Sequence, residues 1–122
     1  MPSAGGNILI VEDDQDVRES TAMILEAAGY SVVTAAHGEE ALRQLRSSAP
    51  CCLILLDLYM PVMNGWAFRA EQLRDPNLAS IPVVVVSADG AVGQRAADLG
   101  ARGYVGKPID FDRLLALVGA HC

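Results

Sequence analysis

The sequence lacks any hydrophobic run long enough to cross a bilayer. Its longest apolar stretches, residues 51–56 and 82–86, are only a few residues each, whereas a membrane-spanning helix needs about 20. The N-terminal residues 1–7 also lack the basic start and long apolar region of a secretory signal. We therefore expect a cytoplasmic protein with no membrane partner.

Clustered basic residues are also absent. Lysine and arginine together number 9 against 15 acidic residues, which gives a formal net charge of −6. A surface of that charge disfavours non-specific contact with nucleic acid, so we expect no nucleic-acid partner. Lys107 is the single lysine; every other basic residue is an arginine.

Cysteine is scarce, with three residues in the chain. Cys51 and Cys52 are neighbours and cannot easily bridge to each other, and an odd number leaves at least one thiol unpaired. Together with Cys122 they are expected to be reduced, as is usual in the cytoplasm. His37 and His121 are isolated, and no zinc-ligand spacing is present.

What the chain does have is enough apolar material for one hydrophobic core. It contains 122 residues, of which 52% are hydrophobic and 20% charged. Such a length and composition suit one folded domain and argue against disorder. We expect a flexible segment at residues 1–6, followed by one domain over residues 7–122.

Short apolar, β-rich runs alternate with amphipathic stretches along that domain. The runs predict strands at residues 7–11, 30–35, 51–56, 81–87 and 102–106. The stretches between and after them predict helices at residues 14–29, 38–47, 64–74, 91–99 and 110–120. Buried strands that alternate with helices predict an α/β fold, with a five-stranded parallel sheet covered by helices on both faces.

Polar side chains follow four of the five predicted strands. They are Glu12, Asp13 and Asp14 after the first strand, Asp57 after the third, Ser87 after the fourth and Lys107 after the fifth. The carboxyl ends of parallel strands meet at one edge of a sheet, which is where such folds place their functional sites. We therefore expect these side chains to form one site.

The residue types at this edge suit phosphoryl chemistry. Clustered carboxylates repel one another unless a hard cation such as Mg²⁺ lies between them. Asp57 would then offer an oxygen that attacks phosphorus. Lys107 would neutralise charge on the transferred group, and the Ser87 hydroxyl would donate a hydrogen bond to it.

At these positions the sequence resembles the receiver domain of two-component response regulators, in particular the single-domain chemotaxis regulators. The resemblance lies in residues 8–14, 55–61, 64–65, 85–88 and 100–108. It implies a flavodoxin-like (βα)5 fold with strand order 2-1-3-4-5.

The resemblance also implies a role for each acidic residue. Asp57 would accept phosphate from a histidine kinase or a histidine phosphotransfer protein. Asp13, Asp14 and Asp57 would bind Mg²⁺, or Mn²⁺ in its place, together with the backbone carbonyl of Tyr59. Asp14 is favoured over Asp13 as the direct ligand.

The remaining family positions imply a switch. Lys107 would pair with phosphate and be joined to Pro108 by a cis peptide bond. Ser87 and Tyr104 would move when Asp57 is phosphorylated, and the surface of the fourth helix, fifth strand and fifth helix would then bind a downstream protein target. A monomer or a weak homodimer is expected, without turnover of an external substrate.

Tyr59 and Asp89 lie two residues after Asp57 and Ser87, at positions that tune the lifetime of the phosphoryl group in the family. The glycine-rich residues 88–93 predict a mobile loop and a loosely held fourth helix.

Two other functions are open to the same fold. One is a protein-interaction module that works without phosphorylation. The other is an enzyme, either an aspartate-nucleophile phosphatase or a flavin-binding protein. The phosphatase would need a second acid close after Asp57, where this chain has Tyr59, and the flavin would need a phosphate-binding loop after the first strand.

Overall fold

Strands and helices alternate along the whole of the computed structural model, which describes residues 6–47 and 50–122. The strands are β1 (Asn7–Val11), β2 (Val32–Ala35), β3 (Cys51–Leu56), β4 (Val83–Ser87) and β5 (Gly103–Gly106). The helices are α1 (Gln15–Ala27), α2 (Gly38–Ser47), α3 (Gly65–Arg74), α4 (Val92–Asp98) and α5 (Phe111–His121). The flexible segment predicted at residues 1–6 lies outside the described residues, apart from Gly6.

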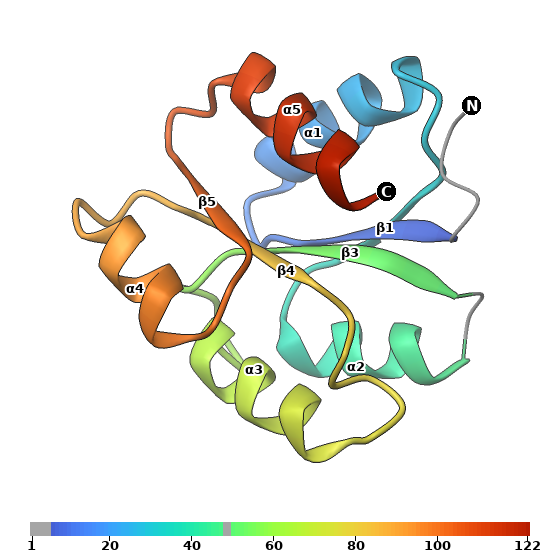
Figure 1. The fold of residues 1–122 in the computed structure, drawn as a ribbon, viewed down its shortest axis with the longest axis vertical. Coiled ribbons are helices and arrows are strands. Elements are labelled where there is room, and N and C mark those ends of the chain that lie inside the picture. The colour runs from blue at the N-terminus through green and yellow to red at the C-terminus, as the bar shows by residue number, and fades with distance from the viewer. Residues whose placement is uncertain (1–5, 48–49) are drawn as a thin grey trace.

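The strands form one parallel sheet in the order β2-β1-β3-β4-β5 (Figure 1). This arrangement confirms the predicted α/β class and strand order. In the register, Val11 at the end of β1 lies beside Ala35 of β2 and Leu56 of β3. The residues that follow β1 and β3 therefore emerge side by side at the carboxyl edge.

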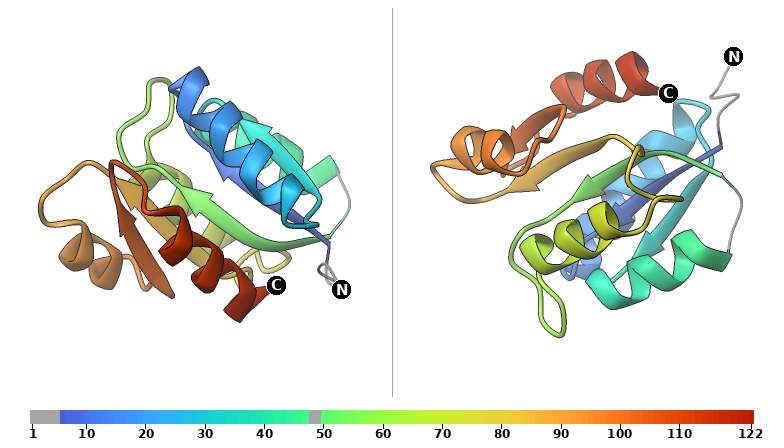
Figure 2. Two further views of the ribbon diagram at one scale, coloured as in Figure 1. Left: turned by 90° about the horizontal axis from the view of Figure 1, so that it is seen from above. Right: turned by 60° about the horizontal axis from the view of Figure 1, so that its bottom comes forward.

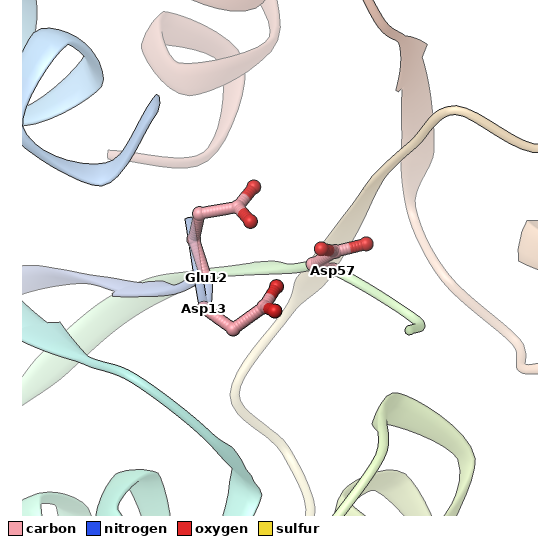
Figure 3. A group of neighbouring side chains, drawn as sticks. All are labelled: Glu12, Asp13 and Asp57. Atoms are coloured by element: carbon pink, nitrogen blue, oxygen red, sulfur yellow. The ribbon is translucent and has the colours of Figure 1, made fainter. Parts of the chain in front are cut away.

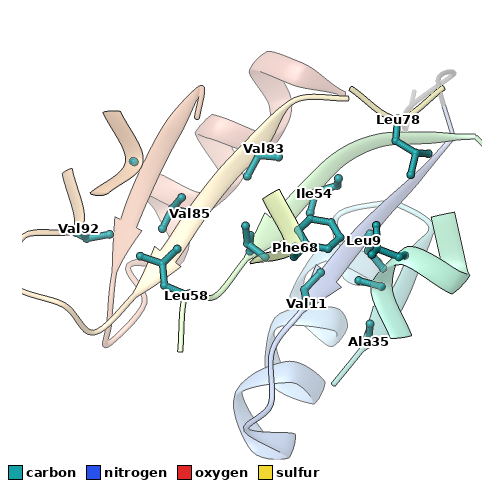
Figure 4. Close-up of a cluster of buried hydrophobic side chains, with 14 residues drawn as sticks. Leu9, Val11, Ala35, Ile54, Leu58, Phe68, Leu78, Val83, Val85 and Val92 are labelled. Carbon is teal, nitrogen blue, oxygen red and sulfur yellow. The ribbon is translucent and has the colours of Figure 1, made fainter. Parts of the chain in front are cut away.

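Helices cover both faces of the sheet, with α1 and α5 on one face and α2 and α3 on the other (Figure 2). Side chains of a strand alternate between faces, so Ile8 and Ile10 pack in the α1–α5 layer while Leu9 and Val11 pack in the opposite layer. The second layer includes the fully buried Phe68 of α3 (Figure 4). Burial on both faces holds the strand ends in fixed positions.

Polar caps set the start of three helices. Asp14, Asn64 and Asp110 each accept a hydrogen bond from a backbone N–H in the first turn of α1, α3 and α5. Helix α1 ends at Ala27, two residues before the predicted boundary. Among the described residues, no helix has the length and apolar character that a membrane crossing requires.

The prediction of three reduced cysteines is wrong for two of them. Cys52 and Cys122 form a disulfide between β3 and the residue after α5, with their Cα atoms 5.6 Å apart. Strand alternation directs the Cys52 side chain to the layer that contains α5, whereas Cys51 packs in the opposite layer and remains a free thiol. Adjacency in the sequence excludes a bridge between Cys51 and Cys52, but no local pattern reports the proximity of Cys52 to Cys122.

Reduction of the disulfide should destabilise the domain. The bridge joins residues 70 positions apart, and removing such a cross-link costs about 2–4 kcal/mol in free energy of unfolding. Denaturant unfolding with and without dithiothreitol measures the difference. Cys51→Ser should keep the response to reductant, and Cys122→Ser should lose it. Three titratable thiols in unreduced, unfolded protein would contradict the disulfide.

Candidate functional site

Asp57 is held rigidly at the carboxyl end of β3. It is 5% exposed, and its backbone N–H donates to the Val11 carbonyl at 3.0 Å, which continues the pairing of β3 with β1. Its carboxylate accepts from Lys107 Nζ at Oδ2, at 3.3 Å, and from the Tyr59 backbone N–H at Oδ1, at 3.4 Å. The sheet and these donors together fix the direction of the carboxylate.

Two further carboxylates reach the same point from the end of β1. Glu12 and Asp13 each bring an oxygen near one from Asp57, with all three oxygens within 4.8 Å of one another. Figure 3 shows the three side chains converging from the ends of the two strands. Glu12 and Asp57 are buried, whereas Asp13 is exposed, so the group opens to solvent on the Asp13 side.

Lys107 supplies the positive charge at this edge. Its ammonium lies 2.6 Å from Glu12 Oε1 and 3.3 Å from Asp57 Oδ2. The residue follows β5, its backbone N–H donates to the Ser87 carbonyl at 3.0 Å, and the bond to Pro108 is cis, as the resemblance implied. One ammonium therefore bridges two carboxylates that come from different strands.

The structure does not place Asp14 in this group. Its side chain accepts from the Val17 backbone N–H at 3.1 Å and so caps α1. Its own N–H donates to Glu12 Oε2 at 3.1 Å. The preference for Asp14 over Asp13 as a direct metal ligand therefore has no support in the geometry. Glu12 is expected among the acids at this edge but without a role as a metal ligand, whereas the structure brings it together with Asp13 and Asp57.

The other residues predicted for the site differ in how deeply they are buried. Ser87 is fully buried at the end of β4, and its hydroxyl accepts from the Asp89 backbone N–H at 3.3 Å. Tyr104 is 40% exposed, and its ring lies 4.9 Å from the Arg113 guanidinium. Tyr59 also projects outward, where its hydroxyl meets Asp89.

Comparison with known proteins assigns the chain to one family. A family model described as the response regulator receiver domain matches residues 8–119. The chain belongs to this family. It is similar to the response regulator MprA of Mycobacterium avium, with 40% identity over 115 residues, which cover 93% of this chain and 49% of MprA. The receiver domain thus spans about half the length of the curated relatives it matches.

Solved receiver structures have the same fold. The chemotaxis response regulator CheY4 of Vibrio cholerae is 29% identical, with a TM-score of 0.86 and coverage of 98% of this chain and 100% of CheY4. TrrA of Thermotoga maritima, solved in complex with Mg²⁺ and BeF, is 28% identical, with a TM-score of 0.83 and coverage of 96% and 99%. These likenesses confirm a flavodoxin-like domain of two-component signalling.

Burial and charge set the proton affinities inside the receiver domain site. Burial raises the pKa of Glu12 from 4.5 to about 7, although the hydrogen bond from Lys107 opposes the shift. Burial lowers the pKa of Lys107, but its hydrogen bond to Glu12 and the charge of Asp57 outweigh burial and raise that pKa overall. Lys107 therefore stays cationic, and the proton that enters near neutral pH binds Glu12.

The donor set of the receiver domain fits Mg²⁺ or Mn²⁺. Glu12, Asp13 and Asp57 offer only carboxylate oxygens, which are the ligands these hard cations bind. The exposed side of the group leaves room for the waters that Mg²⁺ retains. Two buried acids share one ammonium here, and a divalent cation would stabilise their remaining negative charge.

Affinity for Mg²⁺ should rise with pH through about 7, the pKa of Glu12. Below that pH Glu12 is protonated and neutral, and metal binding must displace its proton. Titrations monitored by Trp66 fluorescence at a series of pH values measure this dependence. Glu12→Gln should weaken binding and flatten the pH profile. An affinity independent of pH in the unmodified protein would show that Glu12 is not a ligand.

Proposed function

We propose that this receiver domain accepts a phosphoryl group on Asp57 from a histidine kinase or a histidine phosphotransfer protein, with Mg²⁺ or Mn²⁺ bound. The observation that carries the proposal is the buried Asp57 carboxylate, with one oxygen on Lys107 and the metal-competent acids Glu12 and Asp13 around it. A loop carboxylate without function would not require such surroundings.

In the proposed reaction an Asp57 oxygen attacks the phosphorus of a phosphohistidine. The new O–P bond forms as the P–N bond breaks, and the electron pair of that bond leaves with the histidine nitrogen. Lys107, now released in part from the Asp57 oxygen, binds a phosphoryl oxygen and neutralises its charge. Because Asp57 is fixed by β3 and by the Val11 carbonyl, little ordering is needed before the attack.

Glu12, Asp13 and Asp57 would hold the metal. When bound, it would neutralise the charge that spreads over the phosphoryl oxygens. The role of the protein is then to keep three carboxylates close enough to bind one cation. The rigid register of β1 beside β3 accomplishes this.

Phosphorylation would be read out by a protein partner. Ser87 lies buried at the end of β4, and Tyr104 lies exposed on β5. We propose that these two residues respond to the phosphoryl group and change the surface of α4, β5 and α5. On this proposal the domain is a cytoplasmic switch that turns over no external substrate, because the phosphoryl group remains on its own side chain.

Replacement of Asp57 tests the proposal directly. Asp57→Asn keeps the size of the side chain and removes the nucleophilic oxygen, so labelling from a radiolabelled phosphodonor should fall by at least about a hundredfold, the scale on which catalytic groups act. Asp75→Asn, at the C-terminal end of α3, is the control and should label normally. Equal labelling of Asp57→Asn and the unmodified domain would sink the proposal. No response of the unmodified domain to Mg²⁺, acetyl phosphate or beryllofluoride would favour a phosphorylation-independent interaction module.

Lys107→Ala separates metal binding from switching. Loss of the ammonium leaves two buried carboxylates unpaired, which lowers stability without metal. It also removes the competitor of Mg²⁺ for Glu12, so Mg²⁺ should bind about tenfold more tightly, equivalent to about 1.4 kcal/mol. The phosphorylation-induced change in Trp66 fluorescence should be lost. A variant that still shows the full change would refute the role of Lys107.

A further inference from the structure

Three side chains outside the acidic group connect the two loops that flank Asp57. The Tyr59 hydroxyl donates to Asp89 Oδ2 at 2.5 Å. Arg95 Nε donates to the same oxygen at 3.2 Å. Tyr59 lies in the loop after β3, Asp89 in the loop after β4, and Arg95 on α4, so a single carboxylate oxygen joins three segments. The phosphoryl chemistry uses none of these contacts.

Asp89 is also bound on its other side. Its Oδ1 accepts from the Ala91 backbone N–H at 2.8 Å, immediately before α4. Its own backbone N–H donates to the Ser87 hydroxyl oxygen at 3.3 Å. One residue therefore links the buried hydroxyl of the site to the start of α4. Although it lies in a loop, the Asp89 side chain is only 14% exposed.

The tyrosine ring is itself held by α3. Tyr59 packs edge-on against Trp66, with ring centroids 5.2 Å apart and planes at 70°. The hydrogen bond from Tyr59, then those from Ala91 and Arg95, lower the pKa of Asp89 to about 2, so Asp89 is an anion throughout the physiological range. Asp89 in turn raises the pKa of Tyr59, which keeps the hydroxyl proton on the tyrosine.

The two ends of α4 are held by different kinds of contact. At the C-terminal end the buried Arg69 of α3 donates to the Leu99 carbonyl at 2.9 Å and the Gly100 carbonyl at 3.4 Å. At the N-terminal end Ala91 provides no side-chain cap, and a Cβ built on Gly90 would meet nothing within 4 Å. The first turn of α4 is held by the buried Val92 and by the contacts of Asp89 and Arg95.

We propose that Tyr59, Asp89 and Arg95 form a latch that fixes the loop after Ser87 and the first turn of α4. In this latch Arg95 is a positioning residue: it acts through Asp89 on the Ser87 hydroxyl. Opening of the latch frees the N-terminal end of α4 to pivot about the anchor made by Arg69. The link to switching rests on the proposed function, whereas the latch itself is a property of the unphosphorylated domain.

Amide hydrogen exchange without metal or phosphodonor tests the latch. Arg95→Ala and Tyr59→Phe should each raise exchange at residues 88–95 by about twofold to fivefold, the range for an exposed ion pair. Residues 99–101, next to Arg69, should be unchanged. Arg74→Ala, which removes a surface pair with Glu71 on α3, is the matched control and should leave residues 88–95 unaffected.

Two further readouts separate positioning from a general loss of stability. Arg95→Lys should restore most of the protection at residues 88–95. In the double variant Arg95→Ala with Tyr59→Phe, the increase in exchange at residues 88–95 should be smaller than the product of the two single increases. The reason is that both side chains bind the same Asp89 oxygen. Unchanged exchange in Arg95→Ala and Tyr59→Phe, or fully multiplicative effects, would overturn the latch.

These measurements remain interpretable if phosphorylation fails. If Asp57→Asn labels normally but the exchange results are as described, the latch stands and the proposed function falls. If Asp57 proves to be the acceptor but exchange is unchanged in the latch variants, the proposed function stands and the latch falls.

Discussion

The ammonium of Lys107, placed between the carboxylates of Glu12 and Asp57, is the interaction on which the site depends. Two buried acids this close would otherwise repel each other and favour protonation. The ammonium partly neutralises both carboxylates. It can be displaced from them by a metal, and it can then bind a phosphoryl oxygen. Lys107, the one lysine of the chain, follows β5 and bridges an acid that follows β1 to one that follows β3.

The pairing register of the strands makes this bridge possible. Val11 pairs with Leu56, so Glu12 and Asp57 leave the sheet at the same level. Ser87 at the end of β4 pairs with Gly106, which places Lys107 immediately beyond the same edge. Apolar layers on both faces prevent the strands from slipping, since a shift of one residue would turn each buried side chain to the wrong face. The hydrophobic core thus determines the spacing of the charges.

Much of this could be predicted because it follows from periodicity and from the position of polar residues at strand ends. The strands and the convergence of Asp57, Ser87 and Lys107 on one edge are of that kind, whereas the strand order is implied by the resemblance to receiver domains. The choice between Asp13 and Asp14 could not be made in the same way, because it depends on the backbone direction after β1 and on which acid caps α1. The Cys52–Cys122 disulfide and the contact of Tyr59 with Asp89 join residues 70 and 30 positions apart, and no local pattern reports such proximities.

Membership of the receiver family gives the fold and the signalling system, and the geometry adds which atoms of this chain would perform the chemistry. The most direct measurement is a diffraction structure of the domain with Mg²⁺ and beryllofluoride, a mimic of the phosphoryl group. We predict beryllium bonded to an Asp57 oxygen, fluoride in contact with the Lys107 ammonium, and the metal bound by Glu12, Asp13 and Asp57 with Asp14 still capping α1. Beryllofluoride bound elsewhere, or a metal held by Asp14 in place of Asp13, would contradict this prediction.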